Sequence, residues 1–252
     1  MSKFAEKLQH VYRGVVSSMG FRRAGEEEIP QMMIVARLSN AGIKAAKTAA
    51  GADAVIINGK GLSAEDIKQL AGVLGEVPLG VVIEDSDSTS VDEVVEAGCD
   101  FVVFDIKTSL ETVNKEGPGK ILKIDSTMDL GMIRAINGLP LSIDGVFIAG
   151  EDSAITIERL LICRRFADLL DKPLLLNAST SVTSGELSSL CEAGVKGIVI
   201  SSSITMKAIA ELKKAVSCMP KPTRRKTKVA PILPRLSPEP EAMADEEEEE
   251  DI

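Results

Sequence analysis

At 252 residues the chain has the length of one α/β domain with a tail, because domains of about 200 to 250 residues bury a full core. Its net charge of −9 argues against broad attachment to nucleic acid or anionic lipid, and no apolar run suits a signal peptide or a membrane span. We therefore expect a cytoplasmic protein that binds neither a membrane nor nucleic acid, with an aliphatic core because the chain has no Trp, one Tyr and six Phe.

The first segment of the chain predicts an amphipathic helix, residues 3–19. Its apolar side chains recur at helical spacing: Phe4, Leu8, Val11, Val15 and Met19. This stripe could pack on the wall of the following domain, on its amino-terminal mouth or on a second subunit of a homo-oligomer, and packing on the domain is favoured. The single histidine, His10, lies in this helix, so no histidine-based triad is expected.

Three later segments are nearly alike: AGADAVIIN, AGCDFVVFD and AGVKGIVIS. Each predicts the end of a helix followed by a buried strand, with Gly51, Gly98 and Gly194 as left-handed C′ residues. A weaker copy, IDGVFIAG, fills the longer gap between the second and third. Four further strands are predicted at MMIVARL, LGVVIED, KILKIDS and LLLNAS, each shortly after a proline, Pro30, Pro78, Pro118 and Pro173.

Helical patterns fill the intervals between these strands. They cover residues 42–50, 64–74, 91–97, 110–115, 130–137, 156–170, 184–193 and 205–216. Strand and helix thus alternate eight times, and no GxGxxG motif follows the first strand. This pattern predicts a single-domain (β/α)₈ TIM barrel rather than an open doubly wound sheet.

Aligning the even-numbered strands predicts which side chains fill the barrel in layers of four. The layers are Ala54/Phe101/Gly145/Gly197, Ile56/Val103/Phe147/Val199 and Asn58/Asp105/Ala149/Ser201. The third layer is polar. It falls at the carboxyl ends of the strands, where the active sites of barrel enzymes lie.

We divide the chain into an N-terminal helical extension (residues 1–29), the barrel (30–218) and a disordered tail (219–252). The tail is rich in proline and carries a basic stretch and then an acidic one. A solubilising role is favoured, and the alternative is contact with a protein partner through VAPILP. The cysteines lie far apart without a CxxC pair, which predicts reduced thiols rather than a zinc site or disulfides: Cys99, Cys163, Cys191 and Cys218.

The candidate catalytic residues follow two neighbouring strands. Alternation along a strand puts Asp105 and Lys107 on one face, and Lys123 and Asp125 likewise. A lysine among apolar walls can lose its proton near neutrality and act as a Schiff-base nucleophile or a proton donor. The alternative is that the four groups form a salt-bridge network that closes the mouth of the barrel.

Further polar residues at the strand ends are candidate substrate-binding groups. They are Arg37, Asn58, Glu84, Glu151, Asn177, Ser179, Ser201, Ser202 and Ser203. The serines and Asn177 form a candidate anion site after strands seven and eight. No resident cofactor or structural metal is expected, although oxygen ligands at Glu84, Asp85, Asp105 and Asp125 could hold Mg²⁺.

Residues 191–204, CEAGVKGIVISSSI, resemble the last βα unit of the ribulose-phosphate-binding barrels, such as tryptophan synthase α and orotidine phosphate decarboxylase. In these families a helix N-terminus and backbone N–H groups hold phosphate, so the resemblance implies phosphate binding here. This chain has Asn-Ala-Ser-Thr and Ser-Ser-Ser where those families usually have glycines. FDIK resembles part of the decarboxylase motif DxKxxD, with Leu110 in place of the last Asp.

Two functions remain open from the sequence. The leading hypothesis is a carbon–carbon lyase, an aldolase or decarboxylase, that acts on a small anionic substrate, which could carry a phosphate, through the Lys and Asp groups. The competing hypothesis is a non-catalytic barrel that binds or scaffolds a partner through its tail. The missing phosphate glycines favour this second hypothesis.

Overall fold

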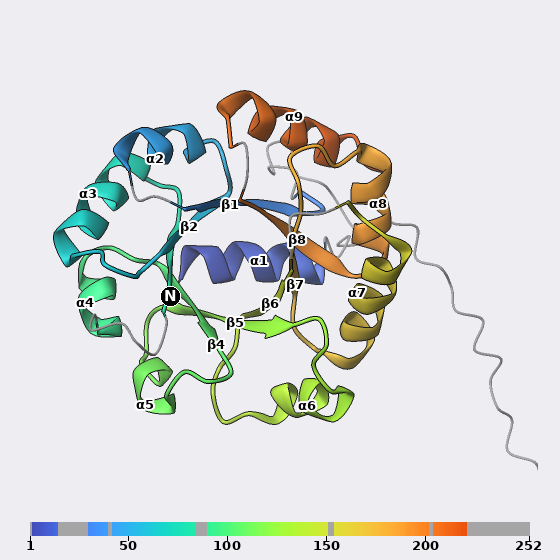
Figure 1. The fold of residues 1–252 in the computed structure, drawn as a ribbon, viewed down its shortest axis with the longest axis horizontal. Helices are drawn as coiled ribbons and strands as arrows, with labels where there is room; N and C mark the ends of the chain where they lie inside the picture. Colours follow the sequence, from blue (N-terminus) through green and yellow to red (C-terminus); the bar gives the residue numbers. More distant parts are fainter. Residues whose placement is uncertain are drawn as a thin grey trace, which may run out of the picture. The chain divides into compact units, whose positions relative to one another are not determined.

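Eight parallel strands close into a barrel in chain order, with β8 paired to β1 (Figure 1). This computed structural model describes residues 2–14, 30–39, 42–83, 90–150, 154–201 and 204–220. The strands are β1 Met33–Leu38, β2 Ala54–Asn58, β3 Leu79–Val82, β4 Phe101–Asp105, β5 Gly119–Asp125, β6 Gly145–Ala149, β7 Leu174–Asn177 and β8 Val195–Ile200. The predicted (β/α)₈ barrel is confirmed.

One helix precedes β1, and the others follow the strands and surround the barrel in the same order (Figure 1). They are α1 Lys3–Arg13, α2 Ile43–Ala49, α3 Ala64–Leu74, α4 Val91–Glu96, α5 Leu110–Val113, α6 Leu130–Ala135 with a 3₁₀ turn Ile136–Gly138, α7 Ile157–Leu169, α8 Ser184–Glu192 and α9 Met206–Ser217. Side chains of the N-cap residues accept hydrogen bonds from first-turn N–H groups in most of them, as at Ser63, Thr156 and Thr205. None of the described helices is long and apolar enough to cross a lipid bilayer.

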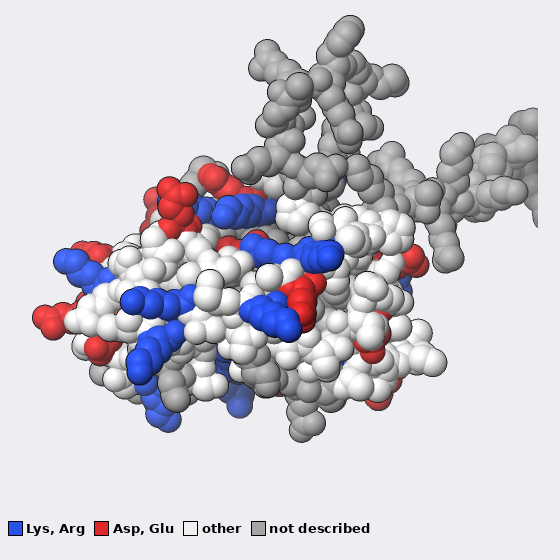
Figure 2. All heavy atoms as spheres, turned by 90° about the horizontal axis from the view of Figure 1, so that it is seen from above, with Lys and Arg blue, Asp and Glu red and all other residues white. Residues whose placement is uncertain are grey.

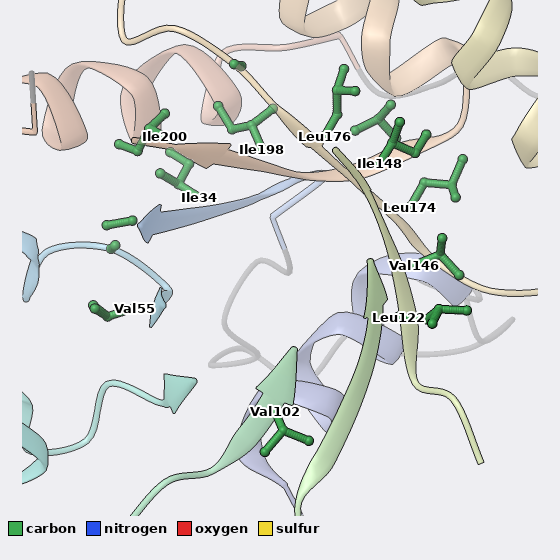
Figure 3. Close-up of a cluster of buried hydrophobic side chains, with 14 of the residues drawn as sticks. Ile34, Val55, Val102, Leu122, Val146, Ile148, Leu174, Leu176, Ile198 and Ile200 are labelled. Carbon is green, nitrogen blue, oxygen red and sulfur yellow. The ribbon is translucent and has the colours of Figure 1, made fainter. Parts of the chain in front are cut away.

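Alternation along the strands divides the apolar side chains into two clusters. One cluster, which includes Ile34, Val102 and Leu122, lies between the barrel wall and the surrounding helices (Figure 3). The other fills the barrel itself and contains Val35, Ala54, Ile56, Phe101, Val103, Ile121, Phe147, Leu175 and Val199. The first two predicted interior layers are therefore confirmed.

Helix α1 closes the amino-terminal mouth of the barrel. Phe4 and Leu8 are fully buried in the interior cluster, and the ring of Phe4 stacks on that of Phe101 with the centroids 4.1 Å apart. Glycines on the barrel strands make room for the helix, since a Cβ on Gly145 would lie 2.9 Å from Leu8 Cδ2. Figure 1 shows α1 lying across the barrel. The sequence left three placements open for this helix, and in the structure it packs on the amino-terminal mouth of the barrel.

Asp100 anchors the first turn of α1. In the equivalent positions of the repeat, the carboxylates of Asp53 and Asp144 accept hydrogen bonds from backbone N–H groups of the preceding strands β1 and β5. The Asp100 carboxylate instead accepts from Ser2 Oγ at 2.7 Å and from the N–H groups of Lys3 and Phe4, each at 2.8 Å. A side chain just before β4 thereby satisfies donors that a helix start leaves unpaired.

Three details correct the sequence analysis. Helix α1 ends at Arg13, because Gly14 has a left-handed φ of 66°, and the rest of the predicted helix lies outside the described residues. Met219, assigned to the tail, is buried in the core, and Gln31 donates a hydrogen bond to its carbonyl. The tail beyond Pro220 lies outside the described residues. The left-handed conformation expected at Gly51 is present at Gly98 and Gly194 but not at Gly51.

This difference between glycines predicts a difference in stability. Replacing Gly194 with alanine is expected to lower the free energy of unfolding by about 1 to 2 kcal/mol. The backbone there has a φ of 103°, and the new Cβ would clash with Ala167 Cβ. Gly51→Ala is the matched control, since its Cβ would meet only Ile209 Cγ2 at 3.6 Å. Urea melts measure the free energy of unfolding of both variants. Equal losses for the two would contradict the assignment of a left-handed backbone to Gly194 and not to Gly51.

Candidate functional site at the carboxyl-terminal end of the barrel

Polar side chains replace the apolar ones where the strands end. They follow the interior residues Val35, Ile56, Val103, Ile121, Leu175 and Val199 at a spacing of two: Arg37, Asn58, Asp105, Lys123, Asn177 and Ser201. Asn177 is buried and the others are half-buried. We call these six residues the polar ring. The ring lies opposite the mouth that α1 fills, so one end of the barrel interior is apolar and closed, and the other is polar.

Asp105 and Lys123 are neighbours in the polar ring, because they are paired Cα partners on β4 and β5. The turn after β4 orients the Asp105 carboxylate, whose Oδ1 accepts the N–H of Lys107 at 2.8 Å. Asp125 is the next inward position on β5, paired with Ala149, and is exposed. Of the predicted group, β4 and β5 therefore bring Asp105 and Lys123 side by side, and Asp125 lies one inward position farther along β5.

Lys107 departs from the prediction. Strand β4 ends at Asp105, and Ile106 and Lys107 form an exposed turn, so strand alternation does not extend to Lys107. The short polar turn DIKTS forms because the Asp105 side chain bonds the backbone two residues later. Lys107 thus stands beside the polar ring rather than in it.

The four candidate catalytic groups, Asp105, Lys107, Lys123 and Asp125, form no ion pair with one another in the described part of the chain. Among the described residues, ion pairs occur only at Lys115–Asp92, Arg164–Asp168, Lys207–Glu211 and Lys213–Asp53. The salt-bridge network considered from the sequence is therefore not formed there. Arg37 and Lys123 are half-buried cations without a carboxylate partner in the described part of the chain. Partial burial strengthens the attraction of such cations for an anion.

The ends of β7 and β8 differ from the predicted anion site. Thr183 and Glu186 form a capping box at the start of α8, and hydrogen bonds from Thr183 lower the pKa of the Glu186 carboxyl. A carboxylate thus already occupies the start of α8, the helix that follows β7, whereas the resemblance of residues 191–204 concerns the helix after β8. The hydroxyls of Ser179 and Ser181 bond to each other at 2.9 Å. Ser202 and Ser203 lie outside the described residues.

Asn177 has contacts that the sequence could not reveal. Its side-chain Nδ2 donates to the carbonyl of Gly150 at the end of β6, and its main-chain carbonyl accepts from Arg159 on α7 at 2.6 Å. Its Oδ1 is buried and has no hydrogen-bond partner among the described residues. Arg159 was missed in the sequence analysis, although its place in the first turn after the N-cap Thr156 put it near the carboxyl ends of the strands.

The described residues contain no group of three or more His, Cys, Asp or Glu side chains placed to hold a metal ion. Glu84 and Asp85, two of the four oxygen ligands considered for Mg²⁺, and also Glu151, lie outside the described residues. Burial raises the pKa of the Cys99 thiol to about 12 and that of the Cys163 thiol to about 11. These two thiols are therefore protonated at neutral pH and unsuited to nucleophilic catalysis.

Comparison with known proteins identifies similar solved structures. No protein-family model matches the chain, and no curated protein sequence matches it. A variant of the tryptophan synthase α-subunit from Pyrococcus furiosus has a TM-score of 0.58 at 13% identity, over 75% of this chain and 97% of that one. Thiamine phosphate pyrophosphorylase from the same organism has a TM-score of 0.52 at 15% identity, over 73% and 96%.

Phosphoribosyl anthranilate isomerase from Thermococcus kodakaraensis has a TM-score of 0.53 at 13% identity, over 73% of this chain and 99% of that one. The similarity to tryptophan synthase α that the last βα unit indicated is thus confirmed in the structure. At such low identity the similarity establishes the fold and leaves the reaction open. The chain has the (β/α)₈ barrel fold that these three enzymes share.

Proposed function

We propose that this protein is a carbon–carbon lyase of the aldolase or decarboxylase type that acts on a small anionic substrate, which could carry a phosphate. The observation that supports it most is the position of Lys123, half-buried in the polar ring beside Asp105 and without an ion-pair partner in the described residues. A lysine so placed is available to react rather than held in a salt bridge.

In the aldolase form of this proposal, the neutral Lys123 amine attacks a substrate carbonyl, and water leaves as the imine forms. The protonated imine accepts the electron pair of the bond between the α and β carbons, which breaks as the β-hydroxyl loses its proton and becomes the carbonyl of the released fragment. The enamine that remains takes a proton at its α carbon, and water then hydrolyses the imine and frees the lysine. Asp105 accepts and returns protons beside it. Asp125, farther out on the same strand, is a second candidate for proton transfer, and Arg37 with Ser179 and Ser201 would bind the substrate anion.

In the decarboxylase form, Lys123 stays protonated and donates its proton to the carbanion that remains when CO₂ leaves. No covalent adduct is needed in this case. The two forms therefore differ in whether a reductant can trap the substrate on the lysine.

Borohydride reduction in the presence of pyruvate, hydroxypyruvate or dihydroxyacetone phosphate, followed by peptide mass mapping, is expected to find an adduct on Lys123. Exposed lysines on outer helices, Lys44 and Lys47 on α2 and Lys68 on α3, should remain unmodified and serve as controls. Figure 2 shows Lys and Arg side chains standing out on the face seen from above, where α2 and α9 lie. Lys123→Met should remove the adduct, and Lys47→Met should retain it.

An adduct on Lys107 would keep the lyase but move the amine to the turn after β4. Release of CO₂ from a keto acid, lost in Lys123→Met and without trapping, would assign the decarboxylase form. If Lys107→Ala and Lys123→Ala bind every ligand as the parent does, or if no ligand is found and both variants only lose stability, the lyase proposal fails. A non-catalytic binding barrel would then remain.

A further inference from the structure

The strongest unexplained feature of the described residues is the Oδ1 atom of Asn177. The residue is 6% exposed, and this oxygen has no hydrogen-bond partner in the part of the chain that the structure describes. Leaving a buried acceptor unpaired costs about 1 to 3 kcal/mol, so folded proteins seldom keep one without a use. Because Asn177 is the β7 member of the polar ring, this atom belongs to the same end of the barrel as Lys123.

The amide cannot relieve the missing bond by turning over. Its Nδ2 donates to the Gly150 carbonyl, and exchange of the two ends would set Oδ1 against that carbonyl oxygen. The backbone of Asn177 is also held, since Arg159 donates to its carbonyl. The amide is therefore fixed in an orientation that leaves its oxygen acceptor unpaired among the described residues.

An unpaired acceptor selects the chemistry of what it meets. A hydroxyl or an amino group can donate a hydrogen bond to it, whereas a carboxylate or a fully ionised phosphate would present lone pairs to lone pairs. Anionic groups have better partners elsewhere in the polar ring, at the half-buried cations Arg37 and Lys123. Asn177 is one of the residues for which the sequence predicts anion binding, whereas its contacts favour the opposite role.

We propose that Asn177 Oδ1 accepts a hydrogen bond from the substrate, which therefore carries a hydroxyl or amino group at the end that reaches β7 in addition to its anionic group. This inference rests on the proposed function, because it takes the polar ring as the place where the substrate binds. The oxygen is closed from solvent in this structure, so binding includes a local shift of the residues around the end of β7.

The test is equilibrium binding of matched probes by titration calorimetry. Hydroxypyruvate and pyruvate differ by one hydroxyl, and glycerol 3-phosphate and propyl phosphate have the same charge but differ in hydroxyls. The full-length protein is expected to bind the hydroxylated member of at least one pair about tenfold more tightly, the effect of one buried hydrogen bond. Asn177→Ala should bring that ratio close to one.

Asn137→Ala is the matched control. Unlike Asn177, Asn137 bonds through both ends of its amide, to Leu169 and Asp171, and it lies on the outer surface, so its removal should leave the ratio unchanged. If Asn177→Ala fails to fold, the side-chain amide signal of Asn177 in the NMR spectrum of the parent gives a second measurement. That signal should shift with the hydroxylated probe and not with its partner.

Equal affinities within both pairs, or no binding of any probe, would overturn the inference. Repeating the titrations with Lys123→Met separates it from the proposed function, because this variant cannot form an imine. Suppose that the parent protein gives neither a trapped adduct nor CO₂ release, while Lys123→Met still binds the hydroxylated probe more tightly. The inference about Asn177 would then stand and the lyase proposal would be rejected. Trapping on Lys123 without any hydroxyl preference would do the reverse.

Discussion

Replacing Phe147 with alanine is expected to lower the free energy of unfolding by about 3 to 5 kcal/mol, the usual cost of emptying a packed aromatic site. Phe147 is 2% exposed and lies in the interior cluster, between its strand partners Lys123 and Leu175. The strands around it are hydrogen-bonded into a closed barrel, which cannot collapse into the space that the lost phenyl group leaves. Urea melts of the parent and the variant measure the loss.

Two variants frame this result. Phe147→Leu keeps most of the volume and should cost less than half as much as the alanine variant. Leu161→Ala removes a side chain of a residue that is 66% exposed on α7 and should change stability by no more than about 0.5 kcal/mol. A loss below about 1 kcal/mol for Phe147→Ala would show that the assignment of the interior layers is wrong.

Replacing Asp100 with alanine is expected to cost about 2 to 4 kcal/mol, because hydrogen bonds from Ser2 Oγ and from two backbone N–H groups of α1 lose one charged acceptor. Besides lowering the stability of the whole domain, the substitution should loosen α1 in particular. Amide hydrogen exchange should speed up in α1, whose Phe4 and Leu8 then keep only their apolar contacts with the barrel interior.

Asp144→Ala is the control for this prediction. The Asp144 carboxylate occupies the same place in the repeat but accepts the backbone N–H of Lys120 on β5, so its loss should leave exchange in α1 unchanged. Equal exchange rates in α1 for the parent and Asp100→Ala would mean that apolar packing alone holds the helix. The anchoring role of Asp100 would then be rejected.

The sequence by itself determined the barrel, its strand order and its interior layers. Each βα unit carries its own signals, such as a buried β-branched run and a polar N-cap like Ser63, and the repeat copies them along the chain. Strand alternation then fixes which side chains face inward, so Phe101, Phe147 and the polar residues Asp105 and Lys123 could be assigned from local pattern alone.

Only the tertiary structure decided how those inward residues are partnered. Asp100 and the first turn of α1 are far apart in the sequence, and nothing local distinguishes Asp100 from its repeat equivalent Asp144. The alternation that held through Asp105 ended before Lys107, because the Asp105 side chain bonds the next turn. The unpaired oxygen of Asn177 depends on where Gly150 and Arg159 lie. Periodic burial is a local property of the chain, whereas hydrogen-bond satisfaction depends on atoms that meet only after the barrel closes.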